Sequence, residues 1–205
     1  MDGLVLPILS DNVGNYQLPD PELVSYYTLE KERKLWLDGE VDINMLEYER
    51  LILRWNIEDA GKPVNERKPI WLYLMNYGGD ADMMWSFIDT IESSVTPVYT
   101  VNMGVCASAA GIIFLSGHKR FMLPRARVVI HEGSASLSGD STKVFDAADS
   151  YKSSLKAMKE HILKKTNIPA KLLNKKRNND WELDSVFCLE HGVCDIIVKT
   201  MDEII

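Results

Sequence analysis

Apolar residues along this chain follow two kinds of pattern, and these patterns predict its strands and helices. Short runs at 33–37, 69–75 and 97–103 indicate strands, and the run at 69–75, which is apolar throughout, is typical of a strand that is covered on both faces in a parallel sheet. Between the first two runs, residues 43–56 place apolar side chains at helical spacing, and Asp42 precedes them as the expected N-cap. The apolar positions of this helix are Met45, Leu46, Leu51, Ile52 and Trp55.

A strand, a turn of small residues and a helix occur twice in succession. The strand at 69–75 runs into a turn at 76–80 and an expected helix over 81–93, whereas the next strand leads through small residues to a buried helix over 111–115. Repeated βα units predict an α/β fold, in which ligands bind at the carboxyl ends of the strands. The Gly78-Gly79 turn and the turn that contains Ser108 are therefore expected to face one crevice.

The second half of the chain adds further strands and a long helix. Strands are expected at 119–124 and 127–130, and His131 stands at the end of the second one. After a small, polar and extended segment at 133–139, an amphipathic helix is expected over about 141–166. One stripe of this helix carries Val144, Phe145, Ala148, Tyr151, Leu155, Met158 and Ile162.

Shorter signals follow the long helix. Residues 164–177 are rich in Lys and Arg and are expected to form a solvated face, and residues 178–181 are expected to form a loop. Asp184 is expected to cap a helix over 185–191. Residues 194–198 then indicate a closing strand or a docked tail.

Length, charge and cysteine content narrow the class of protein. The 205 residues suffice for one domain with a full core, and we expect a single domain over 21–205 that follows a turn-rich arm at 1–20. The net charge of −7 argues against a general attraction to nucleic acid or to an anionic membrane. The three cysteines lack metal-type spacing, so they indicate neither a disulfide framework nor a zinc site.

Residues 93–117 contain no charged side chain and are long enough to span a bilayer. They also contain Pro97, Asn102, Gly104 and Gly111, which would be costly in lipid. We therefore expect a buried strand, a turn and a buried helix here, and no membrane span.

Ser108 is the candidate nucleophile. A serine at a strand-to-helix turn lies beside helix N–H groups whose partial positive charge stabilises an oxyanion, although serine is also a preferred helix N-cap. A serine nucleophile needs a base and a group that orients the base, and His131 is the only one of the four histidines that ends a core strand. The orienting acid stays open on position alone, because four carboxylates qualify to different degrees: Asp146 and Asp149 in a helix, Asp180 in a loop, and Asp184 as a cap.

Several motifs together resemble the proteolytic subunit of the Clp ATP-dependent proteases. They are Asn76-Tyr-Gly-Gly79, Gly104-Val-Cys-Ala-Ser-Ala-Ala-Gly111, Arg120-Phe-Met-Leu-Pro124 and Arg127-Val-Val-Ile-His131. The similarity covers nearly the whole chain, and the order Ser, His, Asp also matches that family. The resemblance implies a fold shared with crotonases, built from repeated ββα units with a protruding long helix.

The resemblance also assigns the site residues of a serine endopeptidase. It implies Ser108 as the nucleophile, His131 as the base and Asp180 as its partner, with the backbone N–H groups of Gly79 and Ala109 as the oxyanion hole. An extended peptide would pair with the segment that begins Gly133, Ser134, Ala135 and Ser136, where small side chains leave the backbone accessible.

The resemblance further implies an assembly. Two stacked heptameric rings would enclose the sites, with the helix at about 141–166 making the ring-to-ring contacts and the arm at 1–20 forming an axial gate. An AAA+ unfoldase that uses ATP would feed unfolded protein into the cytoplasmic chamber, while this subunit itself would need no cofactor. The apolar pocket where the ATPase docks would be lined by Trp71, Tyr73, Phe121 and Leu123; plain core is the alternative role for these four.

Some features depart from the family pattern. Tyr77 replaces the usual Ser-Pro before the glycine pair, and Glu132-Gly133 replaces the usual Gln-Pro after the histidine, which puts a carboxylate beside the base. Cys106, two residues from Ser108, is the alternative nucleophile. A catalytically silent ring subunit and a crotonase-like acyl-CoA enzyme are the alternative functions, although the latter would need a carboxylate where Ser108 stands.

Overall fold

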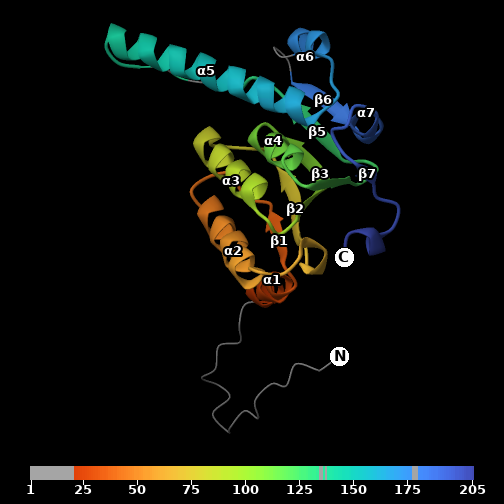
Figure 1. Cartoon of the computed structure of the whole chain (residues 1–205). Coiled ribbons are helices and arrows are strands. Elements are labelled where there is room, and N and C mark those ends of the chain that lie inside the picture. The colour runs from red at the N-terminus through yellow and green to blue at the C-terminus, as the bar shows by residue number, and fades with distance from the viewer. Residues whose placement is uncertain (1–20, 134–135, 137, 177–179) are drawn as a thin grey trace, which may run out of the picture. The chain divides into compact units, whose positions relative to one another are not determined.

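A seven-stranded, mostly parallel sheet organises the chain from Arg33 onward (Figure 1). The central strands follow the order β1-β2-β3-β4-β7, all pairs being parallel, and β5 branches from the end of β3 to pair with an antiparallel β6. The strands are β1 (Lys34–Leu37), β2 (Ile70–Asn76), β3 (Val98–Ala107), β4 (Lys119–Met122), β5 (Arg127–Ile130), β6 (Trp181–Asp184) and β7 (Ile196–Ile197).

The computed structural model describes residues 21–133, 136, 138–176 and 180–205. The chain divides into two compact units, and the boundary along the sequence falls between Glu32 and Arg33. In the first unit the described residues form helix α1 (Pro21–Lys31), which the sequence pattern did not indicate because its apolar residues form no stripe. The predicted arm at 1–20 lies outside the described residues.

The helices of the second unit lie between the strands in chain order. They are α2 (Met45–Glu58), α3 (Ala81–Ser93), α4 (Ala109–Leu115), α5 (Ser141–Lys165), α6 (Ala170–Lys176) and α7 (Ser185–Glu190), with 3-10 turns η2 (Val64–Glu66) and η3 (Met201–Glu203). Asp80 caps α3 by accepting hydrogen bonds from the amides of Asp82 and Met83, and Asp184 caps α7 as predicted.

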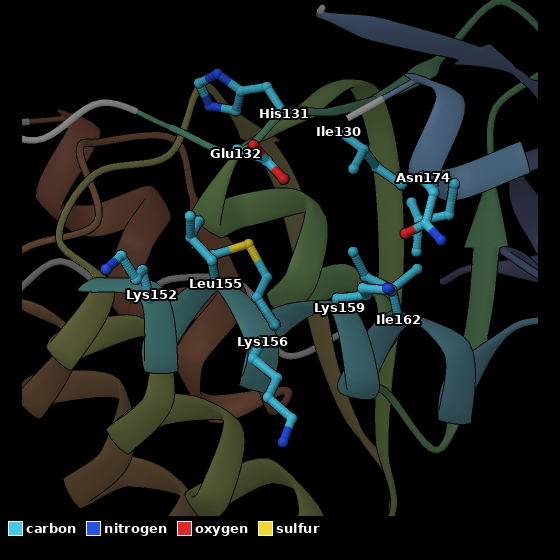
Figure 2. Close-up of a pocket in the computed structure, with 11 residues that line it drawn as sticks. Ile130, His131, Glu132, Lys152, Leu155, Lys156, Lys159, Ile162 and Asn174 are labelled. Atoms are coloured by element: carbon cyan, nitrogen blue, oxygen red, sulfur yellow. The ribbon is translucent and has the colours of Figure 1, made fainter. Parts of the chain in front are cut away.

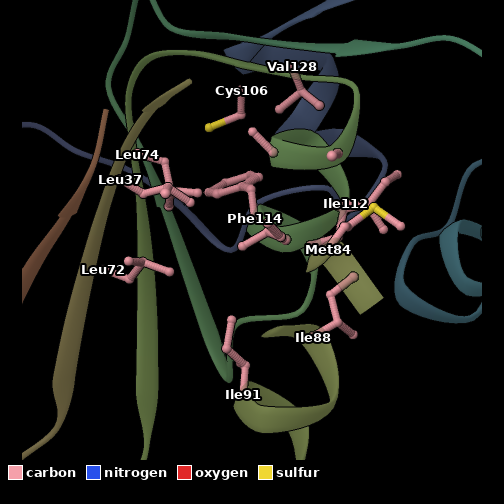
Figure 3. Packing of buried hydrophobic residues seen from close by; sticks show 14 of the residues in the cluster. Leu37, Leu72, Leu74, Met84, Ile88, Ile91, Cys106, Ile112, Phe114 and Val128 are labelled. Carbon is pink, nitrogen blue, oxygen red and sulfur yellow. The ribbon is translucent and has the colours of Figure 1, made fainter. Parts of the chain in front are cut away.

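Side chains alternate between two apolar clusters along each central strand, because successive residues of a strand point to opposite faces. On β2, Leu72 and Leu74 belong to the main core with α2, α3 and α4, whereas Trp71 and Tyr73 belong to a second cluster on the other face. Figure 3 shows the main core closing around Phe114 of α4. The sheet thus has one helix-covered face and one face rich in aromatic side chains.

The uncharged stretch at 93–117 forms a strand and a buried helix, as predicted. The strand is longer than expected, because residues 104–107 continue β3 instead of forming a turn, and α4 begins at Ala109 instead of Gly111. Pairing with β5 through Val105, Cys106 and Ala107 keeps these small residues extended. In the described part of the chain, no helix has the length and apolarity needed to cross a membrane.

Two other expectations were wrong in detail. Asp42 does not cap α2: its carboxylate accepts from the amide of Asn44, and the helix begins at Met45. Trp181 begins the strand β6, where a loop was expected.

The expected long helix is present as α5, and Ile162 of its apolar stripe is buried, while Phe145 is 70% exposed. Residues 170–176 form the helix α6, which the sequence pattern did not indicate. Lys171 and Lys175 on it are exposed, as expected of a solvated basic face.

Candidate active site

A pocket of about 220 Å³ lies where β3, β5 and β6 meet. The residues of each strand that line it are two positions apart, as expected when alternate side chains share one face. They are Val105 and Ala107 on β3, Arg127 and Val129 on β5 with His131 just after it, and Glu182 on β6 with Asp180 just before it. Tyr77 and Ser108 from two turns complete the lining. The structure therefore brings Ser108, His131 and Asp180 to one pocket.

The antiparallel register of β5 and β6 explains how Asp180 comes to lie beside His131. Val129 pairs with Glu182, and continuing this register by two residues places Asp180 opposite His131. The Nδ1 atom of His131 lies 3.4 Å from an Oδ1 atom of Asp180. An acid in this place can hold the imidazole in one tautomer and orientation.

The other ring nitrogen of His131 is available for proton transfer. Its Nε2 atom is buried and has no hydrogen-bond partner among the described residues. Ser108 lies in the same pocket without being hydrogen-bonded to it, which is common before substrate binds, since such bonds tighten in the substrate complex.

Ser108 has a strained backbone. Its φ of 53° and ψ of −128° lie in a region that residues other than glycine rarely adopt, and its side chain makes no capping hydrogen bond to α4. The amide of Ser108 donates to the carbonyl of Val129 at 3.0 Å, which holds this residue against β5. The simple capping role is therefore wrong, and the hydroxyl remains free of the helix.

The Gly78-Gly79 turn packs directly on Ser108. A Cβ atom on Gly78 would lie 2.8 Å from the Cβ of Ser108 and 3.0 Å from the nitrogen of Ala109, so only glycine fits. Val41 forms a parallel bridge with Gly79, donating to Gly78 and accepting from Asp80. In such a bridge the N–H group of Gly79 itself points away from Val41. The two predicted turns thus pack against each other.

Asn76 holds this turn in place, although the sequence analysis gave it no role. Its side chain is buried, its Oδ1 accepts from the amide of Gly78 at 2.7 Å, and its Nδ2 donates to the carbonyl of Gly39. Asn76 thus engages the amide of Gly78, and the amide of Asp80 donates to the carbonyl of Val41, which leaves the amide of Gly79 between them as a donor for a ligand. Alternation along β2 could not reveal this role, because the bond to Gly39 is non-local.

Cys106 is unsuited to be the nucleophile. Its side chain is fully buried, and burial raises the pKa of this thiol well above its ordinary value. The thiol therefore stays protonated, whereas nucleophilic attack needs the thiolate. Among the described residues, no group of three or more His, Cys, Asp or Glu side chains is arranged to hold a metal ion.

A second pocket, of about 370 Å³, is also lined by His131 (Figure 2). Its walls come from Ile130, His131 and Glu132 after β5, from one face of α5, and from Leu173 and Asn174 of α6. The hydroxyl of Tyr151 on α5 donates to the carbonyl of Glu132 at 2.9 Å, which ties the long helix to the residue beside His131. An apolar cavity with polar edges of this kind can hold a ligand side chain.

The remaining predicted residues lie apart from this crevice or are not described. Gly133 and Ser136 are exposed, while Ser134 and Ala135 lie outside the described residues. Trp71, Tyr73, Phe121 and Leu123 lie together in the second apolar cluster, Tyr73 and Phe121 being buried.

Comparison with known proteins finds relatives that cover most of the chain. Residues 22–201 match the family model described as Clp protease. The chain is 29% identical over 174 residues to the "ATP-dependent Clp protease proteolytic subunit 2" of Treponema denticola, covering 84% of each chain. It is 32% identical over 179 residues to the "ATP-dependent Clp protease proteolytic subunit" of Streptococcus uberis, covering 85% of this chain and 88% of the relative.

Replacing Gly78 by alanine should disable the crevice without unfolding the protein. The added methyl group would overlap Ser108 and push the turn away from Ala109, so we expect labelling of Ser108 by a fluorophosphonate to slow by about 10²-fold, as for the loss of one oxyanion donor. Labelling rates are measured by intact-protein mass spectrometry.

Gly104→Ala is the matched control, because a Cβ atom there meets its nearest neighbour, Met75, at an ordinary 3.7 Å. Equal labelling rates for the two variants would contradict the geometry proposed for the turn.

Proposed function

Because the Clp protease family model matches residues 22–201, the chain belongs to the Clp protease family, and we propose that it is a serine endopeptidase with the triad Ser108, His131 and Asp180. The observation that carries the proposal is the shared pocket, which contains Ser108 and in which Asp180 contacts one nitrogen of His131. The other nitrogen has no hydrogen-bond partner within the described part of the chain.

In the proposed mechanism, the Ser108 hydroxyl attacks a peptide carbonyl as Nε2 of His131 takes its proton. The imidazolium that forms is stabilised by the Asp180 carboxylate. His131 then gives the proton to the leaving amine, and water, activated by the same histidine, hydrolyses the acyl-enzyme.

The negative charge of the tetrahedral intermediate would be held by two backbone amides. Ala109 is the first residue of α4, so its N–H group has no acceptor within the helix. The amide of Gly79 points away from Val41 and belongs to the turn that touches Ser108 and Ala109. Two fixed donors at this place would stabilise the intermediate more than the substrate.

Substrate would bind as an extended chain along the segment that starts at Gly133 and includes Ser134, Ala135 and Ser136. The apolar cavity beside His131 would receive a side chain next to the scissile bond. Unfolded protein fits this binding mode, because only an extended backbone can pair with an extended segment.

The site would work inside an oligomeric chamber. The exposed apolar side chains of α5, such as Phe145, lack a covering surface within the described part of this chain, which supports contact with another copy. We propose stacked heptameric rings in the cytoplasm, fed by an AAA+ Clp ATPase that docks on the cluster around Trp71. ATP would be used by this partner, and the subunit would need no cofactor of its own.

The alternatives differ from this proposal in what Ser108 does. In a silent scaffold subunit Ser108 would be unreactive, although its strained backbone and free side chain favour a reactive role. The family assignment favours a peptidase over a crotonase-like acyl-CoA enzyme.

Replacing Ser108 by alanine should abolish peptide cleavage. Loss of the nucleophile leaves only binding and the oxyanion donors, so we expect kcat to fall by about 10⁴-fold or more for a fluorogenic peptide. A fluorophosphonate should label Ser108 in the unaltered protein, and Cys106→Ala should remain labelled. Unchanged cleavage by Ser108→Ala, or no labelling in an assembled ring, would refute the proposed chemistry.

Replacing Asp180 by asparagine tests the weakest assignment from sequence. The amide cannot stabilise the imidazolium and favours the wrong tautomer, so kcat should fall by about 10²- to 10⁴-fold while KM changes little. Asp82→Asn, which neutralises an exposed carboxylate of α3 outside the pocket, serves as the control. Similar steady-state kinetics for both variants would remove Asp180 from the triad.

The native assembly should be many times heavier than the 23.3 kDa chain. If α5 joins two rings, Phe145→Glu should halve the mass measured by light scattering, because it places a charge in an apolar contact. Ser150→Glu adds the same charge on another side of α5 and should leave the mass unchanged. A monomer under all conditions would rule out the chamber.

A further inference from the structure

The cavity of about 370 Å³ beside His131 combines an apolar lining with a group of positive charges (Figure 2). Ile130, Ile162 and Leu173 in its lining are buried. Three lysines of α5, at positions 152, 156 and 159, also line it, because residues three, four or seven apart share one face of a helix. A purely apolar cavity would favour an aliphatic ligand, so these lysines can change which side chain fits.

Two of the three lysines already have a partner on their own helix. The Nζ atom of Lys152 lies 2.8 Å from Oδ1 of Asp149, and the Nζ atom of Lys156 lies 3.8 Å from Oε1 of Glu160. The side chains of these lysines are 74% and 77% exposed, so both face water at the edge of the cavity. Exposed charges of this kind are screened by salt and contribute little to binding.

Lys159 differs from them in burial and in pairing. Its side chain is partly buried, and its ammonium group has neither an ion-pair nor a hydrogen-bond partner within the described part of the chain. The side-chain amide of Asn174, which also lines the cavity, is exposed and likewise unpaired among the residues described. An anion that enters the cavity would therefore find one free cation and one free amide donor.

Glu132 supplies a negative charge to the same lining. With His131 neutral, the described lining carries the positive charges of three lysines and the negative charge of this one glutamate. In the view of Figure 2, Glu132 lies next to His131, whereas Lys159 lies next to Ile162. The free cation and the glutamate therefore belong to different parts of the lining, and the balance of charge favours an anion.

We propose that Lys159 makes this cavity selective for an acidic side chain, so that preferred substrates carry glutamate next to the scissile bond. The methylene groups of that glutamate pack on Leu155 and Ile162, and its carboxylate accepts charge-assisted hydrogen bonds from Lys159 and Asn174. A lysine or arginine of the substrate meets a like charge instead. The inference rests on the proposed function, because it takes the ligand to be a peptide substrate.

The alternative role for Lys159 is that of an ordinary surface lysine, whose stem packs on apolar neighbours while its ammonium group stays in water. Such a lysine would not distinguish glutamate from glutamine in a substrate. These two residues have the same length and shape and differ in charge. Comparing them therefore isolates the contribution of the charge on Lys159.

The first measurement maps cleavage sites in an unfolded protein of known sequence by mass spectrometry. Corrected for abundance, glutamate should flank the cut bond at least about threefold more often than glutamine, as expected of one partly exposed ion pair. Lys159→Met keeps an apolar stem and should abolish this preference, whereas Lys159→Arg keeps the charge and should retain it. Lys164→Met removes the same charge from an exposed position of α5 outside the cavity and should also retain it.

The second measurement needs no catalysis. Ser108→Ala proteins with and without Lys159→Met are titrated with fluorescein-labelled alanine heptapeptides that carry glutamate or glutamine at the central position, and binding is followed by anisotropy. The glutamate peptide should bind at least about threefold more tightly than the glutamine peptide, and only where Lys159 is present. The difference should shrink as salt is added, because salt screens the charges. Thermal unfolding checks that each variant is folded.

A glutamate preference that survives in a folded Lys159→Met protein would overturn the proposal. Equal affinity of the Ser108→Ala protein for the two peptides would overturn it as well, whether or not Lys159→Met folds. Equal affinities would leave the proposed triad intact, because labelling of Ser108 by a fluorophosphonate does not depend on the cavity. An unreactive Ser108 would refute the proposed chemistry, while the peptide affinities would still decide the selectivity, so the two proposals fail separately.

Discussion

The antiparallel pairing of β5 with β6 is the interaction on which the candidate site depends. Every other pair in the sheet is parallel, and this one returns the chain from α6 toward the end of β5. Its register places Asp180 opposite His131, whereas a shift by one residue would turn Asp180 to the other face of the sheet. Buried Leu183, on the opposite face of β6 from Glu182, keeps that register because it packs into the core.

Two close approaches of the backbone complete the crevice. Ser108 adopts a strained conformation between β3 and α4, and the Gly78-Gly79 turn lies against it without room for a side chain. Asn76 and Val41 hold that turn from behind. Strain of this kind persists only where surrounding structure determines it, and here β2, β3 and β5 do so together.

The two faces of the sheet carry different sets of side chains. One face carries the main core, which supports α4 and hence Ser108. The other carries aromatic side chains together with Ile204, and it is built by the alternate residues of the same strands. Strands β2 and β3 contribute side chains to both faces, and the turns that follow them carry Gly78 and Ser108.

The pattern of the sequence by itself predicted the βα units and the long helix α5, because the periods of strands and helices are local properties of the chain. It also predicted that the Gly78-Gly79 turn lies near the Ser108 turn and that His131 ends a strand, because the strands of a parallel sheet end at a common edge. The motifs also named the family. Asp180 could be selected only through the resemblance, since β6 is short and its polar flanking residues gave no strand pattern in the sequence. Only the tertiary structure decided the role of Asn76, the burial of Ile204 and the extra length of β3, because each depends on contacts between residues far apart in the chain.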